Sequence, residues 1–229
     1  MPDKSISVLI PAYNEEKWIG QTIQAAWELP GVLQVLVVDD GSRDRTAMES
    51  FQYGAEVISL KENKGKGYAL NAGADRIKGD ILLLLDADLG TSASLATGLL
   101  EPVVNNRADM TVAIFPKATK KAGLGLVRGV AKKGIHYFTG FELQAPLSGQ
   151  RAMLREVFME TIPLAGGFGV EVDFSIRALL RGYRITEVPL DMFHRETGRN
   201  IKGFLHRGKQ FCHVVRVLLS LKKQGCGNA

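Results

Sequence analysis

Short runs of apolar residues alternate with amphipathic segments along the first half of the chain. These runs have the length and composition of buried strands, and we expect strands at Ile6–Ile10, Leu33–Val38, Ala55–Leu60, Ile81–Leu85 and Asp109–Phe115. Helical spacing follows the first run, where Ile19, Ile23 and Ala26 form an apolar stripe that ends before Pro30. Alternating strand and helix signals predict an α/β fold with a mostly parallel central sheet flanked by helices.

Capping residues indicate where the helices of this half begin. Asn14, followed by Glu15 and Glu16, is typical of a helix N-terminus, so we expect the first helix to begin there. Further helices are expected from about Asp44 to Tyr53 and from the glycine-flanked Lys66 onward. Each helix would then connect two strands of the sheet.

The second half of the chain is less regular. Residues 116–134 are rich in glycine and lysine, which predicts a mobile loop with some helix. Gln150–Glu160 and Val170–Gly182 have helical character, and Arg184–Leu190 predicts a strand. From Asn200 onward the sequence predicts a basic amphipathic helix, with an apolar face formed by Ile201, Phe204, Leu205, Phe211, Cys212, Val215, Leu218 and Leu219.

The composition is that of an ordinary globular protein, with 229 residues of which 45% are hydrophobic and 23% charged. The residues before Ile6 lack the pattern of a secretory signal, and no apolar stretch is long enough to span a membrane. Two late cysteines, Cys212 and Cys226, predict free thiols rather than a disulfide framework. Together these features predict a cytoplasmic protein.

The net charge of +5 is unevenly distributed. Residues 1–109 carry 10 basic and 16 acidic side chains, whereas residues 110–141 carry 6 basic and residues 197–229 carry 7 basic side chains with no acidic ones. Two basic blocks indicate an anionic partner, which could be nucleic acid, an acidic membrane surface or a phosphorylated substrate. Nucleic acid is disfavoured, because aromatic residues do not interleave with the basic ones in a stacking pattern.

Two carboxylates, Asp86 and Asp88, directly follow the most apolar run of the chain. Ligands of α/β sheets bind at the carboxyl ends of the strands, which is where these side chains would emerge. Crowded carboxylates repel each other unless a cation lies between them, and Mg²⁺ or Mn²⁺ takes oxygen ligands and commonly bridges substrate phosphates. The alternative is a polar strand end in which Asp86 caps a turn.

Further motifs occur in order around this pair. They are Pro11-Ala12-Tyr13-Asn14-Glu15, Asp39-Asp40-Gly41-Ser42, Asp86-Ala87-Asp88, Leu147–Ala152 and Gly166–Asp173. This set resembles the family 2 glycosyltransferases of the GT-A fold. Within that family the second half is most similar to polyprenyl-phosphate (dolichyl-phosphate type) sugar transferases. Lys64–Leu70, Pro146–Ala152 and His194 are also similar to glucosyl-3-phosphoglycerate synthase.

The resemblance implies a GT-A domain over residues 1–198, with a nucleotide-sugar-binding half at 1–115 and an acceptor half at 116–198. Residues 199–229 would form the basic C-terminal helix and tail. Two hypotheses stand for this helix. Its basic face lies on an anionic membrane surface, or its apolar stripe packs on the catalytic domain or forms a dimer interface.

The resemblance also implies a donor that is a UDP- or GDP-linked sugar. The residues expected to bind it are Pro11, Ala12, Tyr13, Glu15, Asp39, Asp40, Lys66, Asp86, Ala87 and Gly149. Carboxylates can accept hydrogen bonds from ribose hydroxyls or base N–H groups, and the glycines beside Lys66 allow close backbone approach. Asp88 would be the principal ligand of Mg²⁺ or Mn²⁺, with Asp86 and His194 as further ligands. Dolichyl-phosphate-type enzymes tend to have an acidic residue at the place of His194.

Glu171 and Asp173 are the candidates for sugar contact or general base. Residues two apart on a helix point about 200° from one another, so only one of them would face the site, and the motif position favours Glu171. A hydroxyl acceptor needs a base, whereas a phosphate acceptor is already ionised. Candidates for binding an acceptor phosphate are Arg128, Lys132, Lys133, Arg195 and Arg199, among which Arg128 ranks above its lysine neighbours because arginine binds phosphate bidentately.

We therefore expect a metal-dependent glycosyltransferase that moves a sugar from a nucleoside diphosphate to a phosphorylated acceptor such as polyprenyl phosphate. The alternatives are a soluble acceptor of the 3-phosphoglycerate type and a non-catalytic nucleotide- or membrane-binding regulator. A nucleotidyltransferase is disfavoured because Pro11–Asn14 stands where a glycine-rich basic loop would be expected. A dehydrogenase is disfavoured because no G-x-G-x-x-G follows the first strand.

Overall fold

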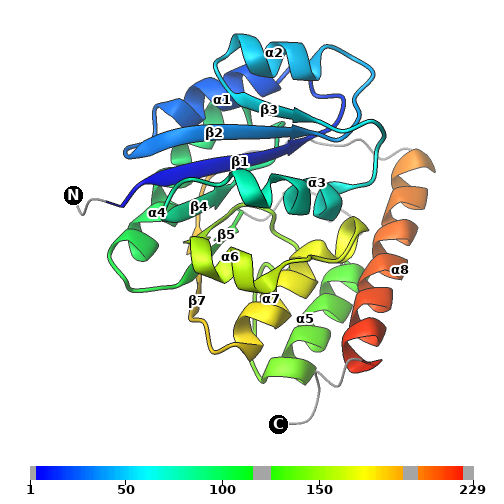
Figure 1. Ribbon diagram of the computed structural model, residues 1–229. Helices are drawn as coiled ribbons and strands as arrows, with labels where there is room; N and C mark the ends of the chain where they lie inside the picture. Colours follow the sequence, from blue (N-terminus) through cyan, green and yellow to red (C-terminus); the bar gives the residue numbers. More distant parts are fainter. Residues whose placement is uncertain (1–3, 116–124, 193–200, 224–229) are drawn as a thin grey trace.

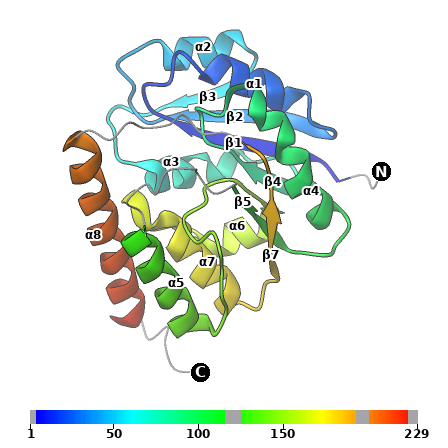
Figure 2. The same cartoon turned by 180° about the vertical axis from the view of Figure 1, so that it is seen from behind.

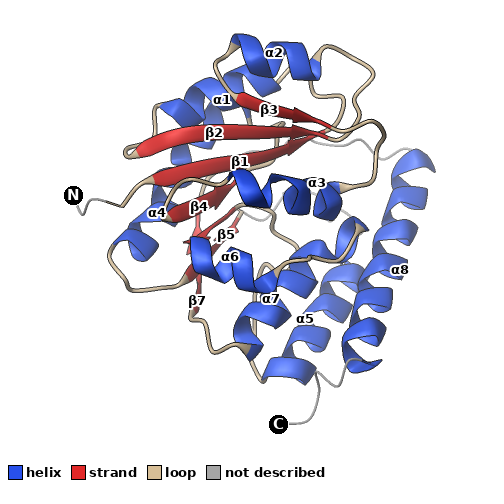
Figure 3. Cartoon of the chain, viewed as in Figure 1, coloured by secondary structure: helices blue, strands red, loops and turns tan. Residues whose placement is uncertain are grey.

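A seven-stranded sheet with helices on both faces forms the centre of the molecule (Figure 1, Figure 3). The computed structural model describes residues 4–115, 125–192 and 201–223. The strands are β1 (Ile6–Ala12), β2 (Val32–Asp39), β3 (Glu56–Ser59), β4 (Ile81–Leu84), β5 (Met110–Ile114), β6 (Arg151–Leu154) and β7 (Ile185–Pro189). Their order is β3-β2-β1-β4-β6-β5-β7, in which β6 runs antiparallel to β4 and β5 and the other pairs are parallel. The expected mostly parallel α/β sheet is confirmed.

Helices cover both faces of this sheet, as the two opposite views show (Figure 1, Figure 2). They are α1 (Ile19–Trp27), α2 (Thr46–Gln52), α3 (Lys66–Gly73), α4 (Thr97–Val104), α5 (Gly125–Thr139), α6 (Arg155–Thr161), α7 (Val170–Leu180) and α8 (Ile201–Lys223), with short 3₁₀ segments η1 (Ala74–Arg76), η2 (Gly90–Ala96) and η3 (Gly167–Gly169).

The strands send alternate residues into two separate cores. Leu9, Leu36 and Leu82 pack with residues of α3 and of α5 to α8, whereas Ile10, Val37 and Leu83 pack with residues of α1 and α4. Because side chains alternate across a strand, a central strand with helices on both faces must be apolar at every position. This requirement explains the uninterrupted aliphatic run of β4.

The chain order reverses beside β1. This strand pairs in parallel with β2 on one side and with β4 on the other. The segments after all three strands therefore meet at one edge of the sheet, and a reversal of this kind leaves a crevice where ligands bind. The motifs that begin at Pro11, Asp39 and Asp86 all lie at this edge.

Two element boundaries differ from the sequence-based expectations. Asn14 is not the N-cap of the first helix, which begins at Ile19. Asn14 has φ +56°, and its side-chain oxygen accepts a hydrogen bond from the Arg43 N–H at 2.8 Å. An asparagine that tolerates left-handed geometry and binds a neighbouring loop produces the same sequence signal as a cap.

The second difference concerns Gln150–Glu160, which is not one helix. Arg151–Leu154 forms β6, and α6 begins only at Arg155. The short apolar segment Ala152–Leu154 suits a strand inserted between β4 and β5. Short apolar runs do not distinguish a buried strand from a buried helix.

The C-terminal helix packs on the rest of the domain through the described part of its length. Val214, Val217 and Leu221 are buried, whereas Cys212 and Leu219, expected on the apolar face, are exposed. The side of α8 that carries Val217 and Leu218 packs closely against two glycines. A Cβ at Gly134 of α5 would lie 2.5 Å from Leu218 Cδ2, and a Cβ at Gly169 would lie 2.6 Å from Val217 Cγ2. Within the described ranges, no helix combines the length and apolar character needed to cross a bilayer.

Helix α5 occupies much of the segment that was expected to be a mobile loop with some helix. Its bounds are Gly125–Thr139, while residues 116–124 lie outside the described residues. Its buried residues Val127, Ala131 and Ile135 recur at intervals of four and face the core. The glycines and lysines on the other positions weaken the amphipathic signal in the sequence.

Candidate functional site

The loop before α3 is fixed to the end of β2 by Asp40. The carboxylate of this buried residue accepts hydrogen bonds from the Lys64 N–H at 2.8 Å and the Gly65 N–H at 2.7 Å. Gly65 has φ +91°, a conformation that favours glycine. These contacts make Lys66 the first residue of α3 and direct its side chain toward the end of β4.

Lys66 forms ion pairs with two acidic side chains from distant parts of the chain. Its Nζ lies 2.6 Å from Asp86 Oδ1, just after β4, and 3.2 Å from Glu171 Oε1 on α7. Burial alone would lower the pKa of Lys66, but the two carboxylates outweigh it and raise the pKa above its ordinary value. Lys66 is therefore a cation throughout the physiological pH range.

Gly149 leaves the space that Lys66 and Asp86 occupy. A Cβ at this position would lie 2.3 Å from Lys66 Nζ and 3.0 Å from Asp86 Oδ1. Any other residue would displace the ion pair. The absence of a side chain at Gly149 is thus part of the geometry of the site.

Gln150 and Arg151 complete the buried wall behind this ion pair, and neither was expected from the sequence to have a role of its own. Gln150 is fully buried, and its Nε2 donates to Asp86 Oδ2 at 2.6 Å. Among the described residues, its Oε1 has no hydrogen-bond partner. The signal that could have identified them is a run of polar residues immediately before a buried apolar segment.

Arg151 is a fully buried cation that ties three segments together. It donates to the Ser148 carbonyl at 3.0 Å, to Ser175 Oγ at 3.1 Å and to the Glu171 carbonyl at 2.9 Å. Burial lowers the pKa of Arg151 to about 10, while Glu171 and Glu187 act in the opposite direction. Its contacts hold the first turn of α7 against the Ser148–Gln150 segment.

Glu171 and Asp173 have different environments on α7. Asp173 is buried and accepts hydrogen bonds from the Ala165 N–H and from Arg177 Nε, both at 2.8 Å. The Glu171 carboxylate instead faces Lys66, with 13% of its side chain exposed. Glu171 is thus placed to meet a ligand, whereas both Asp173 oxygens have structural partners.

The first two motifs gather at the ends of β1 and β2. The Ala12 carbonyl accepts from the Asp40 N–H at 2.8 Å, and Asp39 Oδ1 accepts from the Ser42 N–H at 3.0 Å. The Glu15 N–H donates to Thr46 Oγ1 at 2.8 Å. Tyr13 is exposed and Pro11 is half-buried. The structure brings these residues to one edge of the sheet, and their roles in donor binding stay predictions.

The residues expected to bind a metal ion lie partly inside the described structure. Asp88 is half-buried just after β4, and the carbonyl of buried Ala87 accepts from Thr22 Oγ1 at 2.9 Å. Over residues 4–115, 125–192 and 201–223, no group of three or more His, Cys, Asp or Glu side chains could hold a metal ion. His194 lies outside these ranges. Two carboxylates at one strand end still fit Mg²⁺, which proteins commonly hold through one or two carboxylates together with substrate phosphates.

Three of the candidates for acceptor binding, Arg128, Lys132 and Lys133, lie on α5. Arg128 is exposed and its Nε donates to the Gln144 carbonyl at 3.0 Å. The Glu187 carboxylate accepts from the N–H groups of Gln144 and Ala145 at 2.7 and 2.6 Å. Arg128 and Glu187 thus hold the loop that leads to Gly149. Lys132 is half-buried and Lys133 is exposed, while Arg195 and Arg199 lie outside the described residues.

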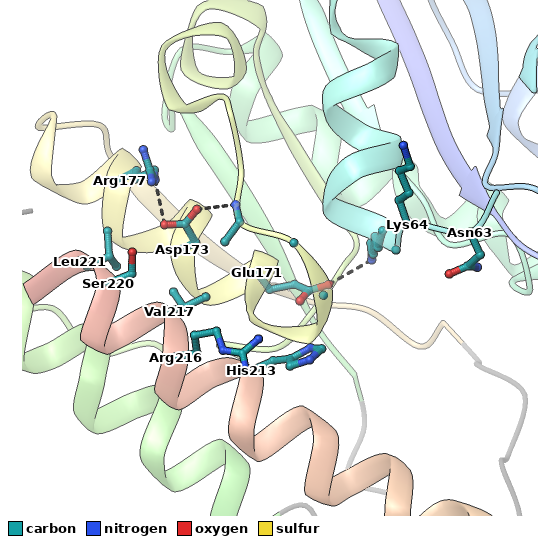
Figure 4. Close-up of a pocket in the computed structure, with 15 residues that line it drawn as sticks. Asn63, Lys64, Glu171, Asp173, Arg177, His213, Arg216, Val217, Ser220 and Leu221 are labelled. Carbon is teal, nitrogen blue, oxygen red and sulfur yellow. Dashed lines mark hydrogen bonds and ion pairs between the residues drawn. The ribbon is translucent and has the colours of Figure 1, made fainter. Parts of the chain in front are cut away.

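A pocket of about 720 Å³ opens beside Glu171 (Figure 4), and Lys66 also lines it. Four segments form its walls: the loop into α3, the turn before α7, α7 itself and α8. The lining residues are Asn63, Lys64, Gly65, Lys66, Ala165, Gly166, Gly167, Glu171, Asp173, Arg177, His213, Arg216, Val217, Ser220 and Leu221. This volume lies in the range of small-molecule sites, which is about 300–1,000 Å³.

Comparison with known proteins agrees with this geometry. The model of the family described as "Glycosyl transferase family 2" matches residues 7–160. Glycosyltransferase AglJ of Haloferax volcanii is 31% identical over 206 residues, which cover 86% of this chain and 65% of that protein. Human dolichyl-phosphate beta-glucosyltransferase is 37% identical over 106 residues, or 39% of this chain and 33% of that protein. The chain therefore spans less than two thirds of the length of either relative.

The fold is shared with a solved enzyme. The crystal structure of glucosyl-3-phosphoglycerate synthase from Mycobacterium tuberculosis, in complex with Mn²⁺, uridine diphosphate and phosphoglyceric acid, has a TM-score of 0.78 and 28% identity, and the match covers 99% of this chain and 80% of that one. The fold is thus the expected GT-A fold. The family match covers well over half of the chain, and the chain belongs to glycosyl transferase family 2.

Proposed function

We propose that this chain transfers a sugar from a nucleoside diphosphate sugar to a phosphorylated acceptor. The observation that supports this most directly is the position of Lys66, which contacts Asp86 at the strand ends and Glu171 on the wall of the pocket. One cation thus lies between the edge where a nucleotide is expected and a cavity large enough for an acceptor. Sugar transfer requires both ligands to meet at such a boundary.

The donor would lie along the ends of β1, β2 and β4. Carboxylates of Asp39 and Asp86 can accept hydrogen bonds from ribose hydroxyls or a base, and Lys66 can interact with the diphosphate. The solved relative binds uridine diphosphate, which favours a UDP-linked donor here as well. Lys66 would stabilise the negative charge that develops on the diphosphate as the sugar leaves.

A divalent cation would add to this stabilisation. Asp88, with Asp86 and His194, would hold Mg²⁺ or Mn²⁺, and the bound ion would neutralise charge on the leaving diphosphate. Asp88 would be the principal ligand, as the family resemblance implies. The relative crystallised with Mn²⁺ supports this choice of metal ions.

Glu171 would act on the acceptor. In the transfer, an acceptor oxygen forms a bond to the anomeric carbon while the bond from that carbon to the diphosphate oxygen breaks. A hydroxyl acceptor would lose its proton to the Glu171 carboxylate. A phosphate oxygen is already ionised near neutral pH and needs no base, so Glu171 would then serve to orient Lys66.

Two kinds of acceptor are supported by different observations. A polyprenyl phosphate is favoured by the similarity to the dolichyl-phosphate enzyme and by α8, where exposed Leu219, Lys222 and Lys223 suit peripheral contact with anionic lipids at the inner face of a membrane. A small phosphorylated hydroxy acid is favoured by the solved relative in complex with phosphoglyceric acid. Both carry a phosphate group.

A thermal-shift screen of nucleoside diphosphates with and without Mn²⁺ tests the proposal first. We expect one nucleotide to raise the melting temperature only when the metal is present. Turnover of the matching sugar donors with a prenyl phosphate or with 3-phosphoglycerate then identifies the acceptor. A chain that binds no nucleoside diphosphate under any of these conditions would refute the proposal and favour a regulator that has kept the fold.

A further inference from the structure

Helix α8 forms one wall of the pocket beside Lys66 and Glu171. Residues 213–221 of this helix line it through His213, Arg216, Val217, Ser220 and Leu221. Figure 4 shows His213 and Arg216 next to each other on the side of α8 that faces Glu171. The basic C-terminal helix therefore contributes directly to the site as well as covering the core.

Two glycines before α7 bring the helix this close. A Cβ at Gly167 would lie 2.2 Å from His213 Nδ1, and a Cβ at Gly169 would lie 2.6 Å from Val217 Cγ2. Gly167 also has φ +79°, which favours glycine over other residues. The turn that leads into Glu171 and the pocket face of α8 are thus built to fit each other.

The pocket wall formed by α8 contributes the guanidinium of Arg216 and the imidazole of His213. Asp173 is paired with Arg177 at 2.8 Å, and Glu171 is paired with Lys66 at 3.2 Å. Arg216 makes no hydrogen bond or ion pair with the described residues. Its guanidinium offers planar donors that match phosphate oxygens, and the imidazole of His213, one helical turn earlier, lies beside it in the same pocket wall.

The donor diphosphate does not account for these groups. Asp39, Asp86 and Asp88, at the strand ends where the nucleotide is expected, are absent from the residues that line the pocket. Lys66 and Glu171 lie between the strand ends and α8. An anion bound by Arg216 would therefore belong to the second substrate.

We propose that His213 and Arg216 bind the phosphate group of the acceptor, a phosphomonoester whose carbon skeleton lies against Val217 and Leu221. This inference rests on the proposed function, because it assigns the acceptor subsite of the same reaction. It assigns that subsite to α8, whereas the sequence favoured Arg128. The pocket is larger than a phosphate group, and its apolar wall suits either a short polyol chain or the first units of a prenyl chain.

Calorimetric titration of the full chain, with the matching nucleoside diphosphate and Mn²⁺ bound, tests the subsite. Glycerol 3-phosphate and farnesyl phosphate are the two probes, and they distinguish a soluble phosphate from a lipid phosphate. Loss of a charge-assisted contact in Arg216→Gln and in His213→Gln should weaken the probe that binds by about tenfold or more. Lys78→Gln removes an exposed cation that does not line the pocket and should bind as the wild type does.

A titration with the nucleoside diphosphate alone distinguishes failure of the acceptor subsite from failure of the proposed function. We expect the variants to bind the nucleoside diphosphate as the wild type does, with only the acceptor phosphate affected. Unchanged binding of the phosphate probes in Arg216→Gln, or no binding of either probe by the wild type, overturns the subsite while leaving donor binding intact. Failure of the wild type to bind any nucleoside diphosphate instead refutes the proposed function itself.

Discussion

The ammonium group of Lys66 lies 2.6 Å from the Asp86 carboxylate, so the first residue of α3 is joined to the end of β4. These residues are 20 positions apart in the sequence and lie on two different connections of the sheet. About a quarter of each side chain remains exposed, which leaves the pair accessible to a ligand. The pair is thus a contact that a bound nucleotide can rearrange, and it is the basis of the first prediction.

Lys66→Met should impair donor binding more than folding. The substitution keeps the aliphatic stem and removes the charge that would meet the diphosphate, so we expect the donor KM to rise by about tenfold or more. Lys78→Met is the matched control, because Lys78 forms an exposed ion pair with Glu56 at the opposite end of the neighbouring strands. Steady-state kinetics with the matched donor measure the effect. A donor KM equal to that of the control would assign Lys66 a structural role only.

Glu171→Gln should separate the two kinds of acceptor. If the acceptor reacts through a hydroxyl group, loss of the base should lower kcat by about 10²–10⁴-fold. If it reacts through a phosphate oxygen, kcat should fall only slightly, because no proton has to be removed. Measurement of kcat for the variant with each acceptor decides between these outcomes, and an unchanged kcat with a hydroxyl acceptor would exclude Glu171 as the base.

Asp173→Asn provides the comparison on the same helix. Its carboxylate is buried and paired with Arg177, so the substitution should destabilise the protein by about 1–3 kcal/mol. Chemical denaturation measures this loss. We expect the folded variant to keep most of its kcat, and a catalytic loss as large as that of Glu171→Gln would show that the two roles have been assigned wrongly.

Gly149→Ala should disrupt the ion pair between Lys66 and Asp86. The new methyl group would overlap Lys66 Nζ at 2.3 Å and force the ion pair with Asp86 apart. We expect weaker nucleotide binding by calorimetry with little change in the folded state. Gly129→Ala on α5, where a Cβ meets nothing within 4 Å, is the control and should bind nucleotide normally. Equal binding by both variants would contradict the geometry described for Gly149.

The pH dependence of the free energy of unfolding should reflect the ion pair between Asp109 and Arg184, which lie just before β5 and β7. Hydrogen bonds from Arg184 lower the pKa of Asp109 below its ordinary value. A lowered carboxyl pKa stabilises the fold above the pKa of the unfolded chain, and this stabilisation disappears as the pH falls through the folded value. Asp109→Asn should therefore cost about 1 kcal/mol at pH 7, allowing for partial exposure, and the difference from the wild type should shrink below about pH 4.

Denaturant titrations at several pH values measure this difference. Asp75→Asn, an exposed carboxylate on η1, is the control and should change little at any pH. If the difference in the free energy of unfolding between Asp109→Asn and the wild type stays constant from neutral to acidic pH, the lowered pKa of Asp109 is not its cause.

Hydrophobic patterning was sufficient to predict most of the sheet. The β4 run is apolar at every position because it is covered on both faces, and this property also indicated that Asp86 and Asp88 would emerge at a ligand-binding edge. The boundaries were less predictable. Asn14 is a residue type that commonly caps helices, but here its side chain accepts a hydrogen bond from the Arg43 backbone. The two residues are 29 positions apart, and no local sequence signal reveals such a contact.

The sequence motifs indicated the candidate residues that lie near the strand ends. They did not indicate the residues whose contacts depend on how distant segments pack together. Lys66 and Glu171 could be proposed from their motifs. The roles of Gln150 and His213 depend on which segments come together, because Gln150 is defined by its contact with Asp86 and His213 by the docking of α8 on Gly167. Arg128 likewise has a contact that the sequence does not reveal, because its Nε donates to the Gln144 carbonyl, and its role in acceptor binding stays a prediction.

Sugar transfer by the full chain tests the central claim most directly. The measurement is the appearance of labelled sugar on a prenyl phosphate or on 3-phosphoglycerate, starting from the matched nucleoside diphosphate sugar with Mn²⁺, and comparing wild type, Asp88→Asn and the Lys78→Met control. We predict glycosylated product with equal release of nucleoside diphosphate in the wild type and the control, and almost none in Asp88→Asn. Nucleotide binding without any transfer to either acceptor, or full transfer by Asp88→Asn, would contradict the account.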